Sequence, residues 1–213
     1  DQLKKSETCH EFTDTIKLSI IYGIASTMDF LHSQDIIHGN LTPNHILLDE
    51  NYIPKISDFT YSIEIGNEAY YSFENLINNT NYLAPELLMN DASEPPDQTK
   101  ESDVYSFGMI FYEIFSNKKP FGTDQSYQIL KKLKNGHKPE FKSSFNNKLK
   151  KIIKGCWDEN PNDRPSFSDI KDCLKSDKIF MIDSINKDEY KKNIGIIDSK
   201  TKQKKKKKPK ISV

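Results

Sequence analysis

The sequence predicts a mainly α-helical fold with one small β-hairpin. Three features indicate this: an amphipathic pattern over residues 12–33, a strongly apolar segment over 103–115, and a polar turn at 49–51 between two short apolar segments. With 213 residues and 35% hydrophobic content, the chain can bury one core, so we expect one folded domain.

The first expected element is a helix from Phe12 to Ser33. Apolar residues recur there at spacings of three and four, which places them on one helical face, and further apolar residues widen that stripe. We therefore expect this helix to be deeply buried. The residues of the main stripe are Phe12, Ile16, Ile20, Ile24, Met28 and Leu31.

The hairpin is expected to join residues 46–48 to residues 53–56. Pro54 has no backbone N–H to donate, so it should lie at a sheet edge or at the start of its strand. Residues 61–82 show no sustained period and are rich in Asn, Ser and Tyr, which predicts a long irregular segment.

The remaining expected helices complete one domain over residues 1–176. They are a short helical turn at 84–89, an apolar central helix at 103–115, and helices at 124–135, 146–156 and 166–176. Residues 177–199 mix lysine, aspartate and isoleucine without a clear face, so they are expected to form a weakly structured extension. Residues 200–213 are expected to be a disordered lysine-rich tail.

Charge is unevenly distributed along this neutral chain, which has 31 basic and 31 acidic residues. The segment from Lys200 to Lys210 is mostly lysine, so the rest is acidic on balance. Such a run can bind an anionic membrane or nucleic acid, or act as a nuclear address, and the alternative is a solvated tail.

No apolar run reaches the roughly 20 residues needed to cross a bilayer, and no secretory signal precedes Phe12. We therefore expect a cytoplasmic protein, or a nuclear one if the tail serves as an address. Cys9, Cys156 and Cys173 are odd in number and widely spaced, which indicates reduced thiols. The chain begins with Asp1 rather than Met, so we expect an upstream segment in the gene product.

A series of short motifs resembles the eukaryotic protein kinases over residues 10–176. Residues 37–48 read Ile-His-Gly-Asn-Leu-Thr-Pro-Asn-His-Ile-Leu-Leu, and residues 55–60 read Lys-Ile-Ser-Asp-Phe-Thr. Residues 82–86 read Tyr-Leu-Ala-Pro-Glu, 102–108 read Ser-Asp-Val-Tyr-Ser-Phe-Gly, and 156–167 contain Cys-Trp and Arg-Pro-Ser-Phe. Each motif alone is weak evidence, but their shared order is specific. The wording is most similar to the tyrosine-kinase-like serine/threonine branch or to the tyrosine kinases themselves.

The resemblance implies the large C-terminal lobe of a kinase fold, with the small N-terminal lobe missing from this chain. That lobe carries the Gly-rich loop and strand lysine that clamp ATP, and no such pair occurs in these residues. ATP and Mg²⁺ are therefore expected from family resemblance only.

Several catalytic positions are replaced by residues that cannot do the same chemistry. By resemblance, Asn40 stands for the catalytic Asp and Thr42 for the catalytic-loop Lys, but an amide takes no proton near neutral pH and a threonine carries no charge. His45 stands for the second metal ligand, although Mg²⁺ prefers oxygen. Gly39 replaces an Arg that reads phosphate, and Thr60 replaces a Gly in the metal-binding turn, where it should stiffen the backbone.

Other positions are retained. Asp58 corresponds to the principal metal ligand, and the alternative for it is a simple turn residue. Glu86 and Arg164 correspond to a structural ion pair, while Asp103 corresponds to a residue that accepts hydrogen bonds from the catalytic-loop backbone. His38 corresponds to the buried loop histidine, whose simplest role is in the core.

These replacements favour a pseudokinase that acts as a scaffold or allosteric regulator through protein partners in signalling. One alternative is a divergent Ser/Thr kinase that works when joined to its N-terminal lobe, and a weaker one is a membrane or RNA interaction module that uses the lysine tail. The leading hypothesis would fail if another acidic side chain, such as Asp35 or Asp49, occupied the place of the missing base.

Overall fold

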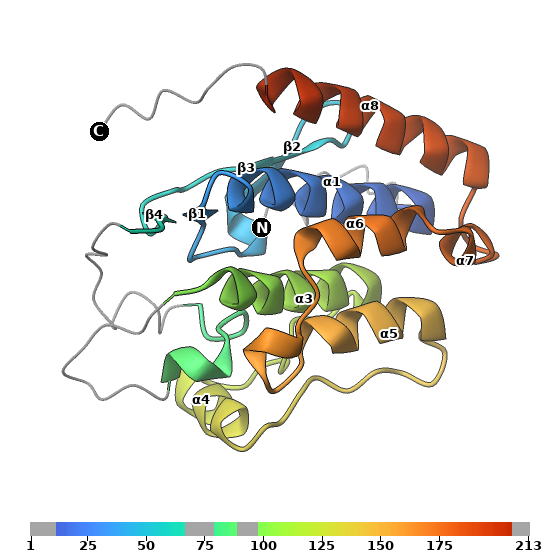
Figure 1. The fold of residues 1–213 in the computed structure, drawn as a ribbon. Coiled ribbons are helices and arrows are strands. Elements are labelled where there is room, and N and C mark those ends of the chain that lie inside the picture. Colours follow the sequence, from blue (N-terminus) through green and yellow to red (C-terminus); the bar gives the residue numbers. More distant parts are fainter. Residues whose placement is uncertain (1–11, 67–78, 89–97, 206–213) are drawn as a thin grey trace.

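The computed structural model describes residues 12–66, 79–88 and 98–205, and it is mainly α-helical with two small antiparallel sheets (Figure 1). The prediction of a mainly α fold with a β-hairpin is therefore confirmed. No helix in the described part of the chain combines the length and apolar character needed to span a bilayer.

Helices α1 (Asp14–His32) and α3 (Lys100–Ser116) form the centre of the core. The Thr13 side chain caps α1 by accepting a hydrogen bond from the Ile16 N–H, and Thr99 forms a capping box with Ser102 at the start of α3. Most side chains of both helices are buried, as their apolar sequences predict. In α3 these include Val104, Phe107, Ile110 and Phe111.

The predicted hairpin consists of β2 (Ile46–Leu48) and β3 (Pro54–Ile56), which pair antiparallel. Pro54 is the first residue of its strand, as expected. It packs against α1 so closely that a Cβ added to Gly23 would lie 2.5 Å from the Pro54 Cγ atom. The hairpin and α1 therefore behave as one packed unit.

The second sheet was not predicted. It pairs β1 (Ile36–Ile37) with β4 (Ile63–Glu64), which lies inside the segment expected to be irregular. A strand of two residues is too short to produce a measurable alternation, so the sequence pattern gave no sign of it.

Four other helices agree with the expected segments to within a few residues: η2 (Pro85–Leu88), α4 (Ser126–Lys134), α5 (Asn147–Cys156) and α6 (Phe167–Lys175). Two short 3₁₀ turns, η1 (Pro43–His45) and η3 (Pro161–Asp163), were not predicted. In Figure 1, α4 and α5 lie at one end of the molecule, and the β2–β3 hairpin lies toward the other end.

The prediction of a weakly structured extension at residues 177–199 was wrong, because α7 (Asp177–Phe180) and α8 (Lys187–Lys205) occupy most of it. Helix α8 packs along α1, on the side of the molecule away from α4 (Figure 1). Tyr190, Ile194 and Ile197 are 0%, 7% and 4% exposed. These three residues form a narrow stripe in an otherwise charged helix, so the sequence showed little apolar signal. The disordered tail predicted for residues 200–213 was also wrong at its start, because residues 200–205 belong to α8, and residues 206–213 lie outside the described residues.

Polar contacts also hold α8 in place. The Asp198 Oδ1 atom accepts a hydrogen bond of 2.6 Å from the Tyr22 hydroxyl, and Oδ2 accepts one of 2.6 Å from the Lys175 ammonium. Burial alone would raise the pKa of Asp198, but the hydrogen bonds from Lys175 and Tyr22 lower it overall. At the far end of the helix, the Lys200 ammonium lies 3.3 Å from the Asp49 carboxylate in the hairpin turn.

Candidate functional site

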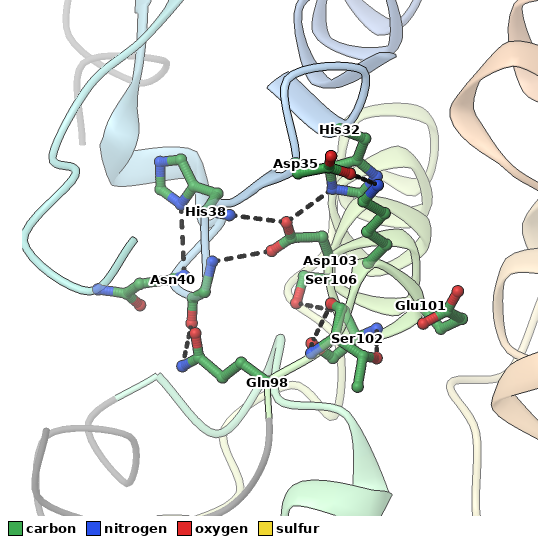
Figure 2. A network of polar contacts seen from close by, with 12 residues as sticks. His32, Asp35, His38, Asn40, Gln98, Glu101, Ser102, Asp103 and Ser106 are labelled. Carbon is green, nitrogen blue, oxygen red and sulfur yellow. Dashed lines mark hydrogen bonds and ion pairs between the residues drawn. The ribbon is translucent and has the colours of Figure 1, made fainter. Parts of the chain in front are cut away.

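The predicted catalytic loop is anchored to the first turn of α3 by Asp103, which is 1% exposed. Its Oδ2 atom accepts a hydrogen bond from the His38 N–H at 2.8 Å, and its Oδ1 atom accepts one from the Gly39 N–H at 3.0 Å (Figure 2). The His32 Nε2 atom lies 2.9 Å from the same carboxylate. One buried side chain thus fixes the backbone of the loop to the central helix.

Gly39 is held by Gln98, a residue that the sequence did not single out. Gly39 has a φ of +75°, and its carbonyl oxygen accepts a 3.0 Å hydrogen bond from the Gln98 side chain (Figure 2). A Cβ at position 39 would lie 1.7 Å from the Gln98 Oε1 atom and 2.6 Å from the Tyr61 backbone carbonyl oxygen. The arrangement requires glycine here, so it would not accommodate an arginine.

His38 is fully buried and both of its ring nitrogens are used. Nδ1 accepts from the Asn40 N–H at 3.3 Å, and Nε2 lies 3.1 Å from the Ser57 carbonyl oxygen, to which it donates. Burial lowers the pKa of His38, although Asp103 and the Ser57 carbonyl partly oppose this. A neutral histidine with both nitrogens occupied is poorly placed to exchange protons.

Asn40 makes its own side-chain contact. Its Oδ1 atom accepts a 2.9 Å hydrogen bond from the Asn79 side chain, and its backbone carbonyl accepts one of 2.8 Å from the His45 Nδ1 atom. Thr42 is 1% exposed, and its hydroxyl lies 3.3 Å from the same His45 nitrogen. The structure therefore brings Asn40, Thr42 and His45 together, as the sequence spacing predicts.

Both oxygens of the Asp58 carboxylate have partners within the chain. Oδ1 accepts hydrogen bonds from the Thr60 hydroxyl at 2.6 Å and the Thr60 N–H at 3.3 Å. Oδ2 lies 3.1 Å from the His45 Nε2 atom. The hydrogen bond from the Thr60 hydroxyl is the main cause of a lowered pKa at Asp58, with smaller contributions from the Thr60 N–H, His45 and His38 against the opposing effect of burial.

His45 lies between two acceptors, the Asn40 carbonyl oxygen and the Asp58 carboxylate. A ring nitrogen that carries hydrogen can donate to the acceptor that faces it. Within the described residues, no group of three or more His, Cys, Asp or Glu side chains could hold a metal ion. This donor set fits Mg²⁺ poorly, since that ion prefers several oxygen ligands.

Neither acidic residue that could have replaced the missing base joins this cluster. The Asp35 carboxylate pairs with the Lys100 ammonium at 2.7 Å. Asp49 accepts hydrogen bonds from the Asn51 and Ile53 N–H groups within its own turn. Both carboxylates therefore have their partners outside the cluster.

Arg164 and Glu86 lie apart from the cluster and form a two-pronged ion pair with distances of 2.6 and 2.9 Å. Arg164 also donates to the carbonyl oxygens of Glu101 and Asp158 at 3.0 and 3.1 Å, and it is 6% exposed. The pair ties η2 to α3 and to the segment before α6.

Comparison with known proteins agrees with the motif order. The family model described as "Protein tyrosine and serine/threonine kinase" matches residues 1–174, which is most of the chain. The chain belongs to the protein kinase family. The resemblance inferred from its motifs is thus confirmed.

The relatives of this kinase-family chain include proteins named as a receptor and as serine/threonine kinases. Atrial natriuretic peptide receptor 2 of Anguilla japonica is 38% identical over 168 residues, covering 73% of this chain and 16% of the receptor. Serine/threonine-protein kinase CTR1 of Arabidopsis thaliana is 31% identical over 178 residues, covering 81% of this chain and 21% of that kinase. Serine/threonine-protein kinase VIK of the same plant is 33% identical over 166 residues, covering 74% of this chain and 37% of that kinase.

Proposed function

We propose that this kinase-family chain is a pseudokinase that forms the large lobe of a kinase fold and acts as a scaffold or allosteric regulator in signalling. The observation that carries the proposal is the closed set of contacts around Asp58. The Thr60 hydroxyl and N–H donate to Oδ1 and the His45 ring lies against Oδ2, so a metal ion at this carboxylate would compete with these contacts.

The position of the catalytic base supports the same conclusion. The side chain of Asn40 is an amide, and its oxygen already accepts a hydrogen bond from Asn79. Thr42 supplies no positive charge for a transferring phosphoryl group, which in kinases depends mainly on positioning and charge neutralisation.

The alternative is a divergent Ser/Thr kinase that transfers phosphate from ATP when joined to an N-terminal lobe. It is favoured by the intact contacts of Asp103 with the loop backbone and of Arg164 with Glu86. These contacts maintain the scaffold, however, and both hypotheses need a folded lobe.

A radiolabelled ATP assay on the longest natural protein that contains this chain distinguishes the two hypotheses. We expect no transfer above the level of an Asp58→Ala variant, and no stabilisation by Mg²⁺ with ATP in thermal unfolding. Robust transfer that Asp58→Ala abolishes would end the pseudokinase proposal. Circular dichroism on each variant checks that the substitution leaves the fold intact.

A triple variant, Asn40→Asp with Thr42→Lys and His45→Asn, provides a matched comparison. It restores the residue types that kinases use at these positions, so a gain of Mg²⁺-dependent stabilisation in this variant alone would link the loss of binding to the replaced residues.

A further inference from the structure

The segment between residues 131 and 154 is rich in lysine and poor in acidic residues. This stretch holds nine lysines and a single acidic residue, Glu140. It covers the end of α4, the connection to α5, and most of α5. Lys132 pairs with Asp124, and Lys148 donates to the Met181 carbonyl oxygen. The other seven make no ion pair with a described residue, and we call them the basic surface: Lys131, Lys134, Lys138, Lys142, Lys150, Lys151 and Lys154.

The fold does not require these charges. Helix α5 turns Leu149, Ile153 and Cys156 toward the core, so its lysines occupy the remaining faces. Like charges held close together repel one another, which opposes folding. An accumulation of positive charge that the packing does not need is more easily explained by a ligand of opposite charge.

Part of the basic surface surrounds a hollow of about 720 Å³. Lys138, Lys150 and Lys154 line it together with the aromatic rings of Phe141 and Trp157. These rings lie 5.5 Å apart between centroids, and the Lys150 ammonium lies 5.2 Å from the centre of the Phe141 ring. The hollow thus offers two aromatic rings with three lysine side chains beside them.

The remaining lining residues narrow the choice of partner. Glu140, Asp158 and Glu159 also line the hollow. These carboxylates would repel a continuous row of phosphates, as in a nucleic acid or a membrane surface, but a peptide can space its acidic residues to avoid them. A concave site also suits a single protruding side chain better than it suits a flat bilayer.

We propose that the basic surface binds an acidic segment of a protein partner, and that an apolar side chain of this segment enters the hollow. The site lies on α4, α5 and the segment between them, on the side of the molecule away from α8 (Figure 1). The inference does not depend on whether the chain transfers phosphate.

Fluorescence anisotropy with labelled peptides tests this proposal. The probes are a Glu- and Asp-rich peptide with one central Phe, the same peptide with Ser in place of Phe, and a Lys-rich counterpart. For the native chain we expect the acidic Phe peptide to bind most tightly, more weakly as salt rises, and the Lys-rich peptide not to bind.

Two charge-reversal variants locate the site. Lys150→Glu with Lys154→Glu should weaken binding by about tenfold or more, because both lysines line the hollow. Lys178→Glu with Lys192→Glu changes the net charge equally, but these exposed lysines lie on α7 and α8. This control should bind as the native chain does. Lys131→Glu with Lys134→Glu on α4 gives an independent reduction if the first variant is unstable in thermal unfolding.

Several outcomes would overturn the proposal. Equal losses in the α5 variant and the α7–α8 control would show a non-specific charge effect. Equal binding of the Phe and Ser peptides would remove the role of the hollow. Tighter binding to phosphatidylserine vesicles or to a single-stranded oligonucleotide, lost in the α5 variant, would assign the surface to a membrane or nucleic acid.

Discussion

Asp58 illustrates how a residue can be retained while its surroundings change. In the structure its carboxylate is held by Thr60 and His45, two residues that replace others in the family pattern. Sequence comparison alone treats these as separate losses. The geometry joins them, because each substituted side chain supplies one partner to the same carboxylate. A single substitution back to the family residue would leave the other partner in place.

Gly39 should tolerate substitution poorly. A Gly39→Ala change combines a φ of +75° with a Cβ that would lie 1.7 Å from the Gln98 Oε1 atom. We expect the free energy of unfolding to fall by about 2–4 kcal/mol. Urea unfolding followed by circular dichroism measures this loss.

Gly66→Ala is the matched control for this prediction. Gly66 also has a positive φ, of +103°, but nothing lies within 4 Å of an added Cβ. The free energy of unfolding of the Gly66→Ala variant should fall by only about 1–2 kcal/mol, because backbone strain alone acts on it. If the two variants lost the same stability, contact with Gln98 would not matter.

The two cysteines within the described residues should differ in reactivity. Burial raises the pKa of the Cys156 thiol to about 12, whereas Cys173 is exposed on α6. Because the thiolate is the reactive form, iodoacetamide should modify Cys173 in the folded protein and reach Cys156 only after unfolding. Peptide mapping by mass spectrometry reads both sites. Modification of Cys156 at the same rate as Cys173 would contradict the buried placement.

For the candidate site, the sequence predicted which residues of the loop would lie together, but not which distant residues would form hydrogen bonds with them. Asn40, His45 and Asp58 were identified from motif order. Gln98 and Asn79 were missed, because each contacts the loop from a distant segment and neither belongs to a periodic or motif pattern. Such contacts depend on the tertiary fold.

Two neighbouring isoleucines on α8 differ in burial and can be compared directly. Ile197 is 4% exposed, while Ile196 is 41% exposed. Ile197→Ala should reduce the free energy of unfolding by about 2–4 kcal/mol, since it removes buried methyl groups and leaves a cavity. Ile196→Ala should cost less than about 1 kcal/mol, because most surface substitutions have small effects. Equal costs in denaturant unfolding would mean that α8 does not pack in the described register.

The attachment of α8 should also weaken in acid. The pKa of Asp198 is lowered in the folded state by Lys175 and Tyr22, so the carboxylate contributes stability above its unfolded value of about 3.9. This contribution is lost as the pH falls through the lower, folded pKa. Unfolding measured from pH 7 downward should show the effect, and Asp198→Asn should flatten that part of the curve. An unchanged slope in the variant would contradict the assignment.

The elements most visible in the sequence were those with wide apolar faces. Residues 14–32 and 100–116 carry strong helical periodicity, and both helices were predicted. Strand β4 and helix α8 were not, because one has two residues and the other buries only a narrow stripe. A helix of that kind is stabilised by its neighbour rather than by its own composition.

For the molecule as a whole, a neutral total charge conceals two basic regions at different ends. One is the basic surface on α4 and α5, and the other begins at Lys200 near the end of α8. Sequence analysis identified only the second, because its lysines are contiguous, whereas those of α4 and α5 are interrupted by the apolar residues that the helices bury.

The pairing of α1 with α8 joins segments from nearly opposite ends of this chain. Ser19, Tyr22 and Ser26 on α1 receive their partners Asn193, Asp198 and Thr201 only after those residues have left the ribosome. Until then one flank of α1 stays open to solvent, chaperones and proteases. A premature stop codon between α6 and α8 would therefore leave this flank of α1 uncovered for good, even though every kinase-like motif had already been translated.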